Sequence, residues 1–280
     1  MLRSLNDLRH YGINATDGDL GWVHDFFFDD CDWVIRYLVI DTGTWLPRQR
    51  VLITWGSVVR ADPAIRRLLV NLTREQVRHC PDIDTEKPVS RQMELKVSEY
   101  FALPPWWAAG GILGPPGVPV PPAELVGRPT ATATAEAPSK EPQLRSVMKV
   151  TGYRIEAIDG PVGHIEDFIC DEETWTIRYL VVDTRNWLPG RKVLISPQWV
   201  QRLSWEEGKA YVDRDRDAIR NSPAYDPTTA VNREYEVRLY GYYGRPRYWW
   251  LDPSERYGCG PSHGAVVAFE NAVQCERCMR

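Results

Sequence analysis

The sequence predicts a mainly β protein made of two tandem, small antiparallel β-barrels, each with one short helix, joined by a proline-rich disordered linker. Three observations lead to this fold class. The chain contains a long internal repeat, each copy holds several short segments rich in Val, Ile, Phe, Tyr and Trp between turn signals, and a stretch rich in proline and glycine separates the copies. The first and third observations define the domains, and the second predicts strands.

The repeat has an offset of 142 positions and contains no gap. The segment IRYLVIDTGTWLPRQRVLI at residues 35–53 returns as IRYLVVDTRNWLPGRKVLI at residues 177–195. When residues 2–107 are aligned with residues 144–249, 39 of the 106 pairs are identical. Solenoid units are only about 20–50 residues long, so a repeat of this length is a duplicated domain. We expect each copy to enclose its own apolar interior.

Four regions are expected: a first barrel with a C-terminal extension, a linker, a second barrel with a C-terminal extension, and a tail, which are residues 1–107, 108–143, 144–250 and 251–280. Ten of the 22 prolines lie between Leu103 and Pro142. This composition predicts an extended linker with polyproline II stretches. Its run GPPGVPVPP could bind an aromatic groove of a partner or serve as a plain spacer.

The first strands of each copy follow a turn. Asp17-Gly18 is a hairpin signal, because glycine tolerates positive φ. The segments WVHDFFFDD and WVIRYLVIDT then have the composition of strands. The second of these is apolar on both faces, so we expect it to lie in the middle of its sheet. Pro47 ends it, and RVLIT is a further short strand.

The rest of each copy predicts more short strands and one helix. Five or six short strands with tight turns are typical of a sheet that curls or closes. The helix should begin after an N-cap at Thr73 or Asp215 and end before Pro81 or Pro223. The extension of the second copy, YEVRLYGYYGRPRYWW, mixes aromatic and basic residues. We favour packing of these rings against the barrel over stacking on single-stranded nucleic acid.

Composition limits the class of protein. The net charge of −4 provides no overall basic footprint, so nucleic acid is not an expected partner. No apolar run approaches the roughly 20 residues that a membrane-spanning helix needs. The N-terminal stretch MLRSLNDLRHYG lacks the apolar region of a secretory signal. We therefore expect a cytoplasmic protein, for which peripheral association with a membrane stays open.

Two long segments resemble one known family. ATDGDLGWVHDFFFDDCDWVIRYLVIDTGTWLPRQRVLI, from Ala15, resembles a PRC-barrel domain, and AIDGPVGHIEDFICDEETWTIRYLVVDTRNWLPGRKVLI, from Ala157, resembles it at least as well. TREQVRHCPDID and KPVSRQMELKVSEYF further resemble the extension of soluble members with two copies. The family includes the cytoplasmic part of the photosynthetic reaction centre H subunit and the C-terminal domain of the ribosome maturation factor. The resemblance implies two tandem PRC-type barrels.

The resemblance implies a binding or assembly module rather than an enzyme, because no catalytic motif belongs to the barrel itself. We therefore expect a scaffold for protein–protein assembly whose partner the sequence does not name. An auxiliary factor in photosynthetic or respiratory electron transfer is one alternative, and a ribosome- or RNA-associated factor is another. The two barrels could pair within one chain, pair between chains as a homodimer, or each hold one partner.

The strongest candidates for an interaction surface are two tryptophan–leucine pairs. Trp45-Leu46 and Trp187-Leu188 each follow the end of the expected central strand. A tryptophan on such a loop can be an interface hot spot, or it can cover the mouth of the barrel as part of the core. Both interpretations stay open.

Two arginines stand among apolar residues of the central strands. Arg36 and Arg178 occupy equivalent positions. A buried arginine needs a partner, which Asp41, Asp25 or an acid of the other copy could supply. We favour such an ion pair over an anion-binding site.

Paired carboxylates recur in both copies, at Asp25 and Asp29 and again at Asp167 and Asp171. Two carboxylates could act as acid and base in a hydrolase. They stand near strand ends and turns, where aspartate commonly accepts backbone N–H groups. We therefore expect a structural role for them and no catalytic residue in the chain.

The tail contains the only spacing that suggests a metal. Three cysteines and one histidine could form a closed tetrahedral zinc site, and free thiols or a redox pair are the alternatives. These residues are Cys259, His263, Cys275 and Cys278. No cofactor is expected elsewhere, because none of the histidines in the repeat is a histidine in both copies.

Overall fold

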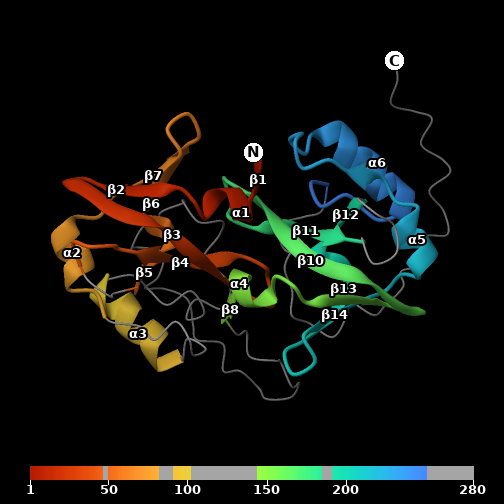
Figure 1. Ribbon diagram of the computed structural model, residues 1–280, viewed down its shortest axis with the longest axis horizontal. Helices are drawn as coiled ribbons and strands as arrows, with labels where there is room; N and C mark the ends of the chain where they lie inside the picture. Colours follow the sequence, from red (N-terminus) through yellow and green to blue (C-terminus); the bar gives the residue numbers. More distant parts are fainter. Residues whose placement is uncertain (47–49, 82–90, 102–143, 185–190, 251–280) are drawn as a thin grey trace, which may run out of the picture.

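The computed structural model describes residues 1–46, 50–81, 91–101, 144–184 and 191–250. It confirms the mainly β class (Figure 1). The first half, in red to yellow, occupies one side of the molecule, and the second half, in green to blue, occupies the other. No helix in this described part is long and apolar enough to cross a membrane.

The two halves contain corresponding elements. The first half contains β1 (Leu2–Ser4), α1 (Leu5–Leu8), β2 (Gly12–Ala15), β3 (Gly18–Asp29), β4 (Ile35–Asp41), β5 (Arg50–Thr54), β6 (Val58–Asp62), β7 (Arg67–Val70), α2 (Arg74–Arg78) and α3 (Arg91–Tyr100). The second half contains β8 (Leu144–Ser146), α4 (Val147–Val150), β9 (Arg154–Ala157), β10 (Gly160–Asp171), β11 (Ile177–Asp183), β12 (Lys192–Ile195), β13 (Val200–Ser204), β14 (Lys209–Val212), α5 (Arg216–Arg220), β15 (Ala224–Tyr225) and α6 (Arg233–Tyr243). Short 3₁₀ turns precede β6 and β13.

Each half builds its sheet in the same strand order. The order is β5-β4-β3-β2-β7-β6 in the first half and β12-β11-β10-β9-β14-β13 in the second, where β15 adds to β12. Two details differ from the expected antiparallel barrel. The pairs β2–β7 and β9–β14 are parallel, and within the described residues no ladder joins β5 to β6 or β12 to β13.

The central strands are where their composition places them. β4 lies between β3 and β5, and β11 lies between β10 and β12. Alternate side chains of β4 enter different apolar clusters: Leu38 and Ile40 belong to the large core, whereas Tyr37 and Val39 belong to a smaller one that includes Val97 of α3. This two-sided burial is the reason for the nearly continuous apolar sequence.

The predicted capped helix is present in both halves. Thr73 and Gln76 form a reciprocal capping box at α2, and Asp215 accepts the N–H of Ala218 at α5. The expectation of one helix per half was wrong, however, because α1, α3, α4 and α6 are also present. α6 begins at the N-cap Asn232 and ends at a left-handed Gly244.

Two glycines allow strands to approach closely. A Cβ atom on Gly21 would overlap the carbonyl oxygen of Asp41, and one on Gly163 would overlap that of Asp183. No side chain fits at either position. This contact explains why both halves carry glycine at the start of the long hairpin strand.

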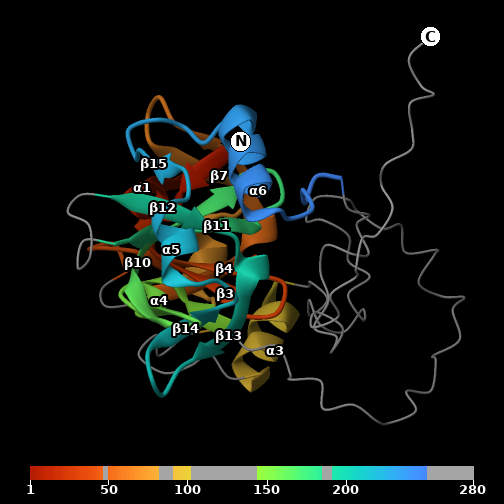
Figure 2. The same ribbon diagram turned by 90° about the vertical axis from the view of Figure 1, so that its right-hand side faces the viewer.

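The apolar interior is shared between the halves, contrary to the expectation that each would enclose its own. The large hydrophobic cluster contains residues of both halves. Across the boundary, the ring centroids of Phe28 and Phe168 are 6.0 Å apart, and those of Phe26 and Trp175 are 6.1 Å apart. Figures 1 and 2 show α3 and α6 far apart, at opposite ends of this joint body.

Candidate interaction site at the seam between the halves

The two halves exchange their first strands. β1 pairs antiparallel with β10 of the second half, and β8 pairs antiparallel with β3 of the first half. α1 and α4, which follow these strands, lie between the two sheets (Figure 1). We call the seam the surface formed by β1–α1, β8–α4, the ends of β3 and β10, and the turns at residues 30–34 and 172–176.

A buried carboxylate of the first half binds the exchanged strand of the second half. We call each exchanged strand, β1 or β8, an arm. Asp25 is 6% exposed and lies on β3. It accepts hydrogen bonds from Ser146 Oγ at 2.6 Å, from the N–H of Met148 at 3.1 Å, and from the N–H of Phe26 at 2.8 Å. Ser146 also caps α4 by accepting the N–H of Lys149. Asp25 thus positions the start of a helix from the other half.

The same arrangement recurs at the symmetric position. Asp167 accepts hydrogen bonds from Ser4 Oγ at 2.5 Å, from the N–H of Asn6 at 3.0 Å, and from the N–H of Phe168 at 2.7 Å. Burial raises the pKa of both Asp25 and Asp167 although their hydrogen bonds lower it. Both carboxylates accept backbone N–H groups, as expected for aspartates of this fold.

The two turns meet at the centre of the seam. The N–H of Ile35 donates to the carbonyl of Trp175 at 2.9 Å, and the N–H of Ile177 donates to that of Trp33 at 2.8 Å. Val34 and Thr176, which occupy the same position in the repeat, form a bridge with each other. A pseudo-two-fold axis therefore passes between them. Both tryptophans have positive φ, 57° and 52°, a conformation that is unfavourable for bulky residues and that the two halves share.

Charged pairs also cross the seam. Arg3 pairs with Glu172, and Arg145 pairs with Asp30 at 2.9 Å. Each arm thus carries one arginine to an acid in the turn of the opposite half. The guanidinium of Arg145 additionally lies 3.6 Å from the ring centre of Trp205.

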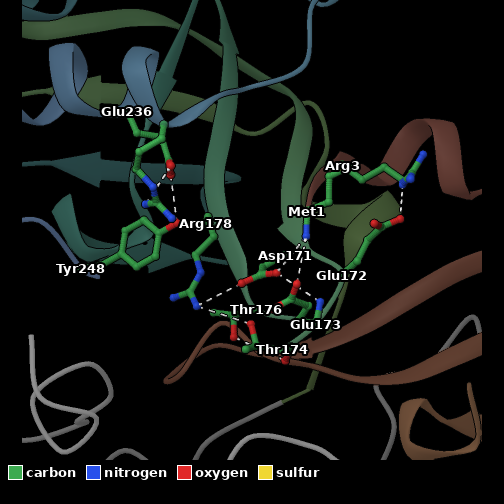
Figure 3. A network of polar contacts seen from close by, with 11 residues as sticks. Met1, Arg3, Asp171, Glu172, Glu173, Thr174, Thr176, Arg178, Glu236 and Tyr248 are labelled. Atoms are coloured by element: carbon green, nitrogen blue, oxygen red, sulfur yellow. Dashed lines mark hydrogen bonds and ion pairs between the residues drawn. The ribbon is translucent and has the colours of Figure 1, made fainter. Parts of the chain in front are cut away.

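The arginines of the central strands make ion pairs, as favoured, and the acids described at them are Asp29 and Asp171 of their own halves. Arg36 Nε donates to Asp29 at 2.7 Å. Arg178 lies 3.5 Å from Asp171, 3.4 Å from Thr174 Oγ1 and 4.3 Å from the ring centre of Tyr248 (Figure 3). These contacts turn both arginines toward the turns of the seam.

The two arginine sites differ at one position, and this difference leads to a prediction. Asp32 stands 3.3 Å from Arg36, whereas the equivalent residue in the second half is Thr174. Burial and the neighbouring Asp29 raise the pKa of Asp32 to about 6, against the effect of Arg36. Between the unperturbed value of 3.8 and about 6, the folded protein holds a proton that the unfolded chain has released. Stability contributed at this site therefore falls as the pH rises through that window.

The variant Asp32→Thr places the residue of the second half at this position. As the pH rises from about 4 to about 6, the free energy of unfolding should fall less in this variant than in the wild type. Urea unfolding at several pH values measures this slope. Thr174→Ser serves as a control without a charge change. An identical slope in Asp32→Thr and wild type would show that Asp32 does not titrate in this range.

A buried glutamate, for which the sequence predicts no role, anchors α6. Glu236 is 2% exposed and accepts hydrogen bonds from Tyr179 at 2.7 Å and Tyr248 at 2.9 Å. Arg233 pairs with its other oxygen at 3.0 Å and lies 4.1 Å from the ring centre of Trp249. A signal was present, since Tyr179 and Glu236 are identical in both copies.

The family comparison bears on the second half. Residues 150–219 match the PRC-barrel domain family. This segment is a PRC-barrel domain. The match begins at the last residue of α4 and ends within α5, so the exchanged strand β8 and the anchored helix α6 lie outside it. No curated protein matches the chain.

The tryptophan of the first half is partly enclosed. Trp45 is half-buried, donates its indole N–H to the carbonyl of Leu20 at 3.0 Å, and has the guanidinium of Arg74 4.6 Å from its ring centre. Trp45 and Leu46 both pack against the core. The equivalent residues of the PRC-barrel domain, Trp187 and Leu188, lie outside the described residues.

The rings that follow the PRC-barrel domain pack as expected. Tyr240 and Tyr243 of α6 are buried and lie 5.4 Å and 4.6 Å from the ring of Trp199. The four candidate zinc ligands, Cys259, His263, Cys275 and Cys278, lie outside the described residues. Within the part that the structure describes, no group of three or more His, Cys, Asp or Glu side chains could hold a metal ion.

Proposed function

We propose that both halves are PRC-barrel units and that the chain is a non-enzymatic binding protein that scaffolds protein–protein assembly. The observation that carries this proposal is the strand exchange at the seam. Each unit holds its neighbour by giving one strand and receiving another, which is how many binding domains recognise an extended peptide. Main-chain hydrogen bonds then supply affinity, and side chains such as Ser4 and Asp167 supply specificity.

The use of the buried acids supports a binding role rather than catalysis. Both oxygens of Asp25 accept hydrogen bonds from protein donors, and so do both oxygens of Asp167. One oxygen of Glu236 likewise accepts hydrogen bonds from two tyrosines, and the other pairs with Arg233. Groups held in this way position elements of the fold and are not poised to move a substrate proton.

The outward surface for a foreign partner is proposed around the strand-end tryptophans, Trp45 with Leu46 and Trp187 with Leu188. Trp45 is half-buried beside the apolar Leu46, which is the composition of an interface hot spot. Arg74 covers one face of Trp45 and leaves the ring held in a defined orientation. A held ring binds a partner with little loss of side-chain entropy.

Affinity purification of the tagged full chain from its native cells should recover a defined set of proteins that the double variant Trp45→Ala, Trp187→Ala no longer binds. Loss of a hot-spot tryptophan typically costs about 2 kcal/mol or more, which is about a 30-fold weaker complex. Ile65→Ala is the matched control, because Ile65 is also apolar and lies in the exposed turn between β6 and β7. Circular dichroism of each variant confirms folding.

The identity of the recovered proteins separates the alternatives. Membrane-bound electron-transfer proteins would favour an auxiliary role in photosynthesis or respiration, and ribosomal proteins or RNA would favour a ribosome-associated role. The same partners on both variants would remove the tryptophans from the proposed surface. A chain that recovers nothing above an untagged control would contradict the scaffold itself.

A further inference from the structure

We propose that the seam is self-complementary, so that each half also binds a second copy of itself in the way it binds the other half. This inference rests on the proposed function and names one partner for it: a second copy of this chain. The pseudo-two-fold axis between Val34 and Thr176 makes the seam isologous, with one surface patch used twice. Such a patch can close a symmetric pair when both partners are identical.

The residues that cross the seam are nearly the same on both sides. The arms carry the identical triplet Leu-Arg-Ser, at residues 2–4 and 144–146. The carboxylates that receive them are aspartates in both halves, and the acids that pair with the arm arginines are Asp30 and Glu172. The N–H donors of Asn6 and Met148 belong to the backbone, so the difference in side chain does not change them.

The serine, arginine and backbone contacts described above can therefore be rebuilt in a pair of second halves. The hydrogen bond from Asn6 Nδ2 to the carbonyl of Glu166 would be lost, because Met148 stands in place of Asn6. Ser146 of one copy would meet Asp167 of the other, and Arg145 would meet Glu172. The turn contact uses backbone groups of Trp175 and Ile177, as it does now. In a pair of first halves, the equivalent contacts would join Ser4 to Asp25 and Arg3 to Asp30. The geometry of the seam would stay the same.

The apolar contacts across the seam differ more between the halves, and they decide which of the three pairs is most stable. Phe28 of the first half contacts Phe168 across the seam, whereas the residue equivalent to Phe28 in the second half is Cys170, which is also buried. A pair of second halves would lose this ring and be underpacked, which is destabilising. A pair of first halves would gain a ring and risk overpacking. The mixed pair should therefore predominate, with the identical pairs as minor species.

Within one chain the linker favours the mixed pair further, because it turns pairing into an intramolecular event. Self-complementarity becomes visible when the linker is cut. A protease site introduced between residues 108 and 143 of the full chain allows this without removing any residue of either half. Cys31 in the turn at the seam is disulfide-bonded, so the cleaved protein is briefly unfolded in urea with a reducing agent and refolded in its presence. Native mass spectrometry then distinguishes the three pairs by mass.

The expected result is a mixture of the mixed pair with both identical pairs. Equal affinities would give each identical pair about half the abundance of the mixed pair, and the packing difference should lower that share.

The matched control is the double variant Arg3→Glu, Glu172→Arg, which restores opposite charges in the mixed pair. In a pair of first halves it places the new glutamate at position 3 against Asp30. In a pair of second halves it places Arg145 against a second arginine, at position 172. Like charges then face each other in both identical pairs, so this variant should yield the mixed pair alone.

Two results would overturn the inference. If the cleaved wild type refolds only to the mixed pair, the seam is specific for unlike halves. If the identical pairs form equally in the charge-exchanged variant, they use another surface. Either result leaves the capture of foreign partners by the intact chain unaffected, so it would not count against the scaffold function.

Discussion

Replacing Asp25 with alanine should lower the free energy of unfolding by about 3–5 kcal/mol, because the variant leaves several buried donors without an acceptor. The N–H groups of Phe26 and Met148 and the hydroxyl of Ser146 all donate to this carboxylate. A buried donor without a partner costs about 1–3 kcal/mol, and more is lost when the acceptor was charged. Equilibrium urea unfolding of the full chain measures the change.

The matched control at this position is Asp25→Asn. The amide oxygen can accept the two backbone N–H groups that now share Oδ1, and the amide nitrogen can donate to the Ser146 oxygen. We expect Asp25→Asn to lose less than half as much stability as Asp25→Ala. Asp167→Ala should behave like Asp25→Ala, since its contacts are equivalent. An Asp25→Ala variant within about 1 kcal/mol of the wild type would mean that β8 and α4 do not depend on this carboxylate.

Replacing Glu236 with alanine should have an effect of similar size, about 3–5 kcal/mol, and should release α6 from the PRC-barrel domain. The hydroxyls of Tyr179 and Tyr248 and the guanidinium of Arg233 would lose their common acceptor. The aromatic rings of α6 pack on the sheet beside this group. The near-ultraviolet circular dichroism of the tyrosines and tryptophans should therefore fall, and trypsin should cut after Arg238 more readily.

The variant Glu236→Gln separates the contribution of the hydrogen bonds to stability from that of the negative charge. Glutamine retains an oxygen for the two tyrosines but loses the ion pair with Arg233, so about 1–2 kcal/mol should be lost. Tyr248→Phe removes one donor and leaves the other, and it should be milder still. If alanine and glutamine at this position are equally stable, packing rather than hydrogen bonding holds α6 in place.

Local features of the fold follow from the sequence, whereas the seam does not. The offset of 142 positions, the apolar central strands and the helices capped by Thr73 and Asp215 are each visible within a few neighbouring residues. α6 escaped prediction because Tyr and Val favour strands, although its N-cap Asn232 and its end at Gly244 are helix signals. Tertiary contact with Tyr179 outweighs that local preference.

At the candidate site, too, local sequence predicts some features and not others. An ion pair for Arg36 follows from its apolar neighbours, but its partner Asp29 is reached only across the hairpin between β3 and β4. The triplet Leu-Arg-Ser is identical in both copies, yet three residues cannot say which sheet they join. Strand exchange depends on the relative placement of the two halves, and no periodicity within either half encodes it.

The exchange of β1 and β8 also has a consequence for synthesis on the ribosome. The N-terminus of the chain leaves the ribosome first. β3 therefore cannot pair with β8 until residues 144–146 have left the exit tunnel. At about 5–20 residues per second, the first half spends several seconds with one edge uncovered while the intervening residues are translated. Nascent chains arrested before Leu144 should be cleaved by protease within the first half, and chains extended beyond the second half should resist cleavage.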